Sequence, residues 1–145
     1  MSNSATETET LSVVVDREFP HPPEKIWRAL TQPHLIEEWL MKNDFKPVVG
    51  HNFNLRGDWG GVLDCEVLAV EPHKRLTYTW NFKHEEAAYN LTSVVAWTLT
   101  PTRTGTHLRM EQSGFRPDQP QAYGGAKHGW QKFFENLEQT LAKVG

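Results

Sequence analysis

Residues 130–141 read Trp-Gln-Lys-Phe-Phe-Glu-Asn-Leu-Glu-Gln-Thr-Leu, and the spacing of the large apolar side chains in this stretch decides the fold. These side chains recur every three or four positions, the period of one face of an α-helix, at Trp130, Phe133, Phe134, Leu137 and Leu141. The same period extends over residues 123–143. At 1.5 Å per residue it predicts a helix about 30 Å long, enough to cross a small domain.

Upstream of this helix, the period of the apolar residues changes to two between residues 44 and 115. The clearest strand is residues 76–82, Leu-Thr-Tyr-Thr-Trp-Asn-Phe, which alternates large apolar with small polar side chains. Val95, Trp97 and Leu99 alternate likewise, and Leu108 and Met110 follow across a turn. Turn-forming residues break the pattern at 47–50, 57–61, 72–74 and 101–105, which predicts an antiparallel meander.

The chain before this meander predicts one strand and two short helices. Residues 12–19 alternate as a strand, and Pro22 and Pro23 then suit the first turn of a helix. Two short apolar stripes follow at helical spacing: Ile26, Trp27 and Leu30, then Leu35, Ile36, Trp39 and Leu40. We therefore expect an α+β domain over residues 11–145, with a curved antiparallel sheet of about six strands wrapped around the long C-terminal helix. Residues 1–10 are polar and acidic and predict a disordered tail.

Composition excludes several classes of function. A formal net charge of −3 over 145 residues gives no basic surface for nucleic acid or an anionic membrane. A single cysteine, Cys65, excludes an intramolecular disulfide, and the polar N-terminus lacks the layout of a secretory signal, so we expect a cytoplasmic protein. No apolar run approaches the roughly 18–20 residues that a membrane-spanning helix needs, so membrane insertion is not expected.

The order of the predicted elements resembles that of the START-like, or helix-grip, superfamily, which includes the birch-pollen-allergen fold. Several stretches are similar to the bacterial branch related to the C-terminal domain of the activator of the heat-shock-protein-90 ATPase: residues 19–31 followed by Trp39, then 75–80, 105–108, 113–115 and 129–130. The resemblance spans residues 11–143. The histidine that the family usually carries before Ser-Gly-Phe is replaced by Gln112.

The resemblance implies a cavity between the sheet and the last helix. Members of the superfamily use this cavity to bind lipids, hormones or polyketides, and some branches catalyse reactions in it. The named activator is a chaperone partner, which adds a chaperone to the partners that the resemblance suggests.

An antiparallel sheet bent around one helix should leave a pocket near the start of that helix, where the two layers diverge. The alternation predicts that inward side chains line it: Tyr78, Trp80, Trp97 and Met110 from the sheet, Trp130 and Phe134 from the helix, and Trp39 and Phe53 near the mouth. Tyr and Trp also carry a polar group that suits a polar ligand atom. The alternative is that these residues form an ordinary packed core.

No residue pattern predicts a catalytic centre, a metal site or a cofactor. Cys65 has no evident base beside it, which favours a structural thiol. His34 and Glu38 stand four apart on a helix but lack a third ligand. Asp64 and Glu66 should point outward if Cys65 points inward, unless a β-bulge at residues 60–61 switches the two faces.

Three glycines, at positions 124, 125 and 129, occur near the start of the long helix. They predict either a close approach of another chain segment or bending of the helix.

Three functions remain open from the sequence. The first is a non-enzymatic module that binds a small apolar or aromatic molecule in the cavity. The second is an enzyme of the cyclase or hydrolase type, which requires an ionisable group with a shifted pKa facing the cavity. The third is a chaperone-associated interaction protein, which requires an exposed apolar patch outside the cavity.

Overall fold

The computed structural model describes residues 10–58, 60–86 and 89–144, so the tail predicted to be disordered lies outside the described residues except for Thr10. The described strands are β1 (Leu11–Phe19), β2 (Lys42–Asn43), β3 (Asn52–Arg56), β4 (Val62–Glu71), β5 (Arg75–Phe82), β6 (Leu91–Pro101) and β7 (Thr106–Phe115). They form a seven-stranded sheet in the order β1-β7-β6-β5-β4-β3-β2, with every neighbouring pair antiparallel. The predicted α+β class is confirmed, and the two-residue β2 adds a seventh strand.

Three described helices accompany the sheet: α2 (Pro23–Thr31), α3 (Pro33–Trp39) and α4 (Pro120–Lys143). Each begins with proline, whose missing N–H and fixed φ suit the first turn of a helix. Helix α4 starts three residues before the predicted boundary because Pro120 initiates it. The apolar stripe that predicted it is buried at Trp130, Phe134, Leu137 and Leu141, and Phe133 is partly buried.

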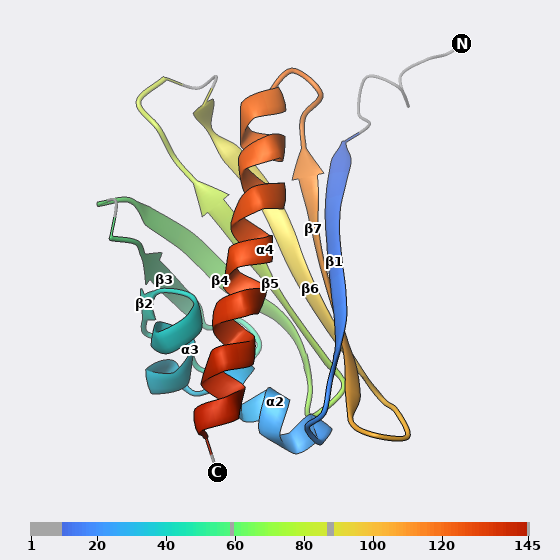
Figure 1. The fold of residues 1–145 in the computed structure, drawn as a ribbon. Helices are drawn as coiled ribbons and strands as arrows, with labels where there is room; N and C mark the ends of the chain where they lie inside the picture. The colour runs from blue at the N-terminus through green and yellow to red at the C-terminus, as the bar shows by residue number, and fades with distance from the viewer. Residues whose placement is uncertain (1–9, 59, 87–88, 145) are drawn as a thin grey trace.

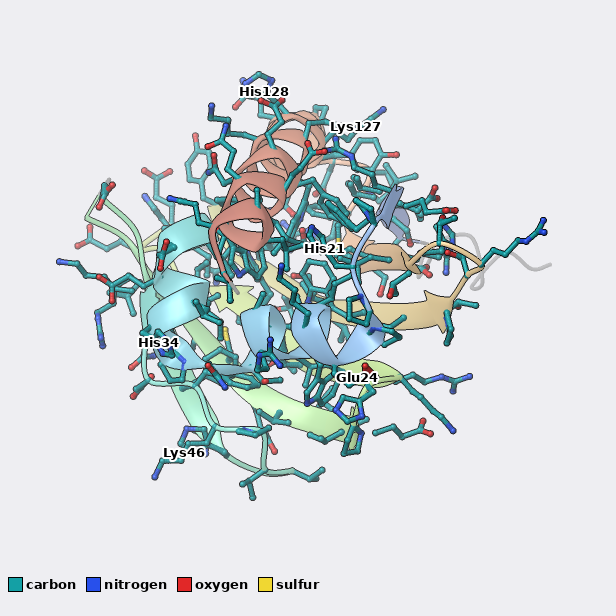
Figure 2. The ribbon with its side chains drawn as sticks, turned by 60° about the horizontal axis from the view of Figure 1, so that its bottom comes forward. His21, Glu24, His34, Lys46, Lys127 and His128 are labelled. Atoms are coloured by element: carbon teal, nitrogen blue, oxygen red, sulfur yellow. The ribbon has the colours of Figure 1, made fainter. Side chains whose placement is uncertain are left out.

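Helix α4 lies across the concave face of the sheet, with α2 and α3 beside its C-terminal end (Figure 1). Lys127 and His128 lie on the side of α4 that faces away from the sheet (Figure 2). In the described part of the chain no helix covers the other end of the sheet, where α4 begins. The layers are therefore closed at one end by two short helices and left uncovered at the other.

The strand register aligns the inward side chains in rows beneath α4. Trp97 of β6 lies opposite Leu76 of β5 and Met110 of β7, and all three are buried. The one register shift within β4 occurs between Val67 and Ala69, so the strand bulges at the exposed Leu68 and not at residues 60–61, where two glycines allowed a bulge. The shift follows Cys65 in the chain, so Cys65 stays inward and Asp64 and Glu66 stay outward, as predicted.

Candidate ligand-binding cavity

A cavity of about 530 Å³ lies between the first half of α4 and the adjacent ends of β4, β5, β6 and β7. The sheet side of its wall is mostly apolar and is formed by Leu63, Trp80, Phe82, Leu91, Gln112 and Phe115. The helix side is formed by Ala122, Gly125, Ala126, Gly129, Trp130 and Phe133, and Tyr89 lies at the mouth. The cavity therefore occurs at the start of the long helix, where the divergence of the two layers predicted it.

Small residues on α4 explain why space remains here. Positions 122, 125, 126 and 129 follow the helical period and face the sheet, and all four are alanine or glycine. A Cβ atom added at Gly125 or Gly129 would meet no atom within 4 Å. The second half of the helix fills the corresponding positions with Phe134, Leu137 and Leu141.

The open space around the glycines of α4 shows that they are not sites where another chain segment approaches closely, one of the two alternatives that the sequence predicted. Nothing lies near enough to Gly124, Gly125 or Gly129 to require the absence of a side chain. Each glycine within a helix costs about 1 kcal/mol relative to alanine. At Gly125 and Gly129 the helix bears this cost, and the missing side chains leave open volume in the cavity.

A chain of buried hydrogen bonds forms the polar part of the wall. The indole Nε1 of Trp130 donates to Oε1 of Gln112 at 2.6 Å, and Nε2 of Gln112 donates to Oγ of Ser93 at 3.0 Å. The hydroxyl of Ser93 donates to the backbone carbonyl of Trp80 at 2.5 Å. Since an indole can only donate and a carbonyl can only accept, these partners fix the orientation of the Gln112 amide. The chain links the indole of Trp130 on α4 to the backbone of Trp80 on β5.

Of the eight residues predicted to line the pocket, the structure brings only Trp80 and Trp130 to this cavity. Their rings lie 5.2 Å apart between centroids. The contribution of either ring to ligand binding stays a prediction.

Three of the other six form a packed aromatic cluster deeper in the core. The ring of Trp97 lies 5.7 Å from that of Trp39 and 5.8 Å from that of Phe134. The indole of Trp39 donates to the backbone carbonyl of Ala29 at 2.8 Å. These large rings face one another across the two layers and fill the space between them, so they do not line the cavity.

The remaining three predicted residues, Tyr78, Phe53 and Met110, are also packed in the core away from the cavity. The hydroxyl of Tyr78 accepts a hydrogen bond from the indole of Trp97 at 3.0 Å, and its ring lies 5.3 Å from that of Phe53. Met110 is fully buried in the row beneath α4. An inward position on a strand therefore did not distinguish cavity wall from core.

Sequence reasoning missed Gln112 and the small-residue face of α4 as parts of the site. Gln112 continues the inward alternation of Leu108 and Met110, and a polar residue in an inward row is a signal for a buried hydrogen-bond network. The spacing of Ala122, Gly125, Ala126 and Gly129 was equally readable in the sequence. The prediction of the site relied mainly on aromatic and ionisable residues, and glutamine, alanine and glycine belong to neither type.

The groups with strongly shifted pKa values lie outside the cavity. Burial, with a smaller effect of the neighbouring Asp64 charge, raises the pKa of Cys65 to about 12, which suppresses the thiolate. Burial also raises the pKa of Tyr78, partly offset by the hydrogen bond from Trp97. Asp64 points away from the core and accepts a hydrogen bond from Asn54 at 2.8 Å. Tyr89 is the one titratable side chain among the described residues of the cavity wall.

No three metal-ligating side chains of the kinds His, Cys, Asp or Glu come together within the described ranges. Glu38 lies 3.8 Å from the ammonium of Lys143, at the far end of α4 from the cavity. None of the described helices is long and apolar enough to cross a membrane.

Several solved structures are similar to this chain. Protein MLL2253 from Mesorhizobium loti is 72% identical, with a TM-score of 0.90 over 93% of this chain and 99% of that protein. DynU16, a protein in the dynemicin biosynthetic locus, is 28% identical, with a TM-score of 0.79 over 91% of this chain and 47% of DynU16. CalU16 from Micromonospora echinospora shares the fold at 24% identity and a TM-score of 0.76, over 93% of this chain and 78% of CalU16. No curated protein matches the chain.

The family comparison covers most of the chain. Residues 20–142 match the family model described as Activator of Hsp90 ATPase homolog 1-like protein. This match, together with the sheet and the long helix that it grips, confirms the resemblance to the START-like superfamily. The chain therefore belongs to the Activator of Hsp90 ATPase homolog 1-like family.

Proposed function

We propose that this protein binds a small, largely apolar molecule, with an aromatic ring system preferred, in the cavity at the start of α4. The observation that carries the proposal is an apolar space of about 530 Å³ with one buried polar network in its wall. Ligand pockets typically have volumes of about 300–1,000 Å³ and combine apolar walls with a few fixed polar groups.

Burial of apolar surface supplies the driving force for this binding. If a ligand of this kind removes about 200 Å² of apolar surface from water, it gains roughly 5 kcal/mol before the costs of association. The indole rings of Trp80 and Trp130 offer flat faces against which an aromatic ligand can stack.

The cavity wall favours binding over acid–base catalysis. Its described residues include no carboxylate, histidine, cysteine or lysine, and its one titratable side chain, Tyr89, is exposed at the mouth. A cyclase or hydrolase of the usual kind needs such a group within hydrogen-bond reach of the reacting atoms. DynU16, which is 28% identical, belongs to the biosynthetic locus of dynemicin, and that setting supports a small molecule as the ligand.

The family description also keeps a role beside a chaperone as a second candidate. The observation that bears on it is a small exposed apolar group at the bulge of β4. Val48 and Val49 are exposed in the loop that hydrogen-bonds to Val67, next to the exposed Leu68. This group lies outside the cavity, so the two candidates can be tested separately.

Native mass spectrometry of freshly purified protein tests the proposed function. We expect an additional mass of a few hundred daltons that is lost on gentle activation, or uptake of one molecule of 2-acetylnaphthalene by protein that has been stripped. Protein that carries no bound mass and takes up no probe would contradict the proposal.

A further inference from the structure

The indole N–H of Trp80 differs from those of Trp39, Trp97 and Trp130. Trp27 resembles Trp80 in having no acceptor among the described residues, but it lies outside the cavity wall. Trp39, Trp97 and Trp130 each donate to a protein oxygen, at 2.8, 3.0 and 2.6 Å respectively. Trp80 has no hydrogen-bond acceptor among the described residues, although its side chain is only 7% exposed. Yet no buried side-chain nitrogen or oxygen in the described part of the chain is without a partner. The Trp80 nitrogen must therefore be accessible to solvent.

The accessible space next to Trp80 is the cavity, because its ring forms part of the cavity wall. Each of the other polar side chains of the wall has a protein partner or lies at the entrance. Oε1 of Gln112 accepts from Trp130, and Nε2 of Gln112 donates to Ser93. Tyr89 is 57% exposed at the mouth, where its hydroxyl can bind water. The interior of the cavity thus presents an unused donor in an apolar setting.

From these contacts, and on the basis of the proposed function, we infer that the ligand carries a neutral carbonyl-type oxygen that accepts a hydrogen bond from the Trp80 indole. The oxygen is neutral because no described lysine, arginine or histidine lines the cavity, and an unpaired charge is costly to bury. A ligand without an acceptor would cover the indole N–H and leave it unpaired, which is also unfavourable. The ligand class is therefore an apolar ring system bearing a ketone, aldehyde or quinone oxygen, in preference to a pure hydrocarbon or an amine.

The test is a cycle of four dissociation constants, measured by calorimetry, for two probes and two proteins. The probes are 2-acetylnaphthalene and 2-ethylnaphthalene, which differ in the carbonyl oxygen, and the proteins are the wild type and Trp80→Phe. Phenylalanine keeps an aromatic ring and removes the N–H, so any loss of contact area affects both probes. We expect the preference for the ketone over the hydrocarbon to fall about fivefold in Trp80→Phe, equivalent to about 1 kcal/mol for one hydrogen bond.

Trp27→Phe is the matched control, because Trp27 is similarly buried but lies outside the cavity wall. It should leave both affinities unchanged. If Trp80→Phe does not fold, the indole N–H resonance of Trp80 in the wild type provides the test: it should move downfield with the ketone and not with the hydrocarbon.

Equal binding of the two probes in both proteins would overturn the inference while leaving the cavity as a binding site. Failure of the wild type to bind either probe would overturn the inference and also count against the proposed function.

Discussion

Substituting Gly129 by leucine should fill the cavity and stabilise the protein while abolishing ligand binding. A Cβ atom at Gly129 meets nothing within 4 Å, so the new side chain enters the cavity without displacing the core. Leucine removes a helix penalty of nearly 1 kcal/mol, and burial of part of its side chain adds about 1 kcal/mol more. A gain of about 2 kcal/mol should raise the Tm by roughly 5 °C or more in a domain of this size.

The assay pairs thermal unfolding with fluorescence titration of 6-propionyl-2-(dimethylamino)naphthalene, a neutral apolar dye. Gly129→Leu should weaken binding of the dye at least tenfold, since the dye and leucine compete for one space. Gly124→Leu is the matched control, because Gly124 is exposed on the same helix and does not line the cavity. Gly124→Leu should gain only the stability that comes from replacing a helical glycine, and it should bind the dye as tightly as the wild type. The reasoning is refuted if Gly129→Leu binds the dye normally, or if both variants lose binding equally.

Two further predictions concern buried polar groups. Gln112→Leu should lower the free energy of unfolding by about 2–4 kcal/mol because the Trp130 indole loses its acceptor and the Ser93 hydroxyl loses its donor. Gln112→His keeps one acceptor and one donor when the imidazole is neutral, so urea denaturation should show nearly wild-type stability at about pH 8. Below about pH 6 protonation removes the acceptor, and the variant should lose stability. Equal stability of Gln112→His at both pH values would contradict this. Burial holds the pKa of Cys65 at about 12, against an ordinary value of 9.0, so the unfolded chain loses this proton first and stability falls above pH 9. Cys65→Ala should make that decline shallower by about 1 kcal/mol per pH unit in urea titrations between pH 9 and 10.5, and an unchanged slope would count against the buried thiol as its source.

The fold could be predicted from the sequence because periodicity reports which face of each element is buried. The stripe from Trp130 to Leu141 predicted α4, and the alternation in residues 76–82 predicted β5. The bulge could not be located in advance, since Gly60 and Gly61 are the residues that usually suggest one, yet the register shifts at Leu68.

The candidate site was only partly predictable, for a physical reason. Divergence of the layers predicted the end of α4 at which the cavity occurs. Whether an inward ring packs or lines a cavity, however, depends on the residue opposite it in the other layer. Trp97 meets Phe134 and is core, whereas Trp80 lies near Gly129 and Gly125 and lines the cavity. Which residues of α4 face which residues of the sheet is set by the tertiary structure, so it could not be predicted from the periodicity of either segment alone.

The ¹H–¹⁵N spectrum of the tryptophan indoles during titration with 2-acetylnaphthalene tests the cavity most directly. Each indole gives one N–H signal, and the described tryptophans sample both the cavity wall and the packed core. We predict that the signals of Trp80 and Trp130 move as the probe saturates, while those of Trp39 and Trp97 stay in place. Shifts confined to Trp39 and Trp97, or no shift at any indole at saturating probe, would contradict a ligand-binding cavity at the start of α4.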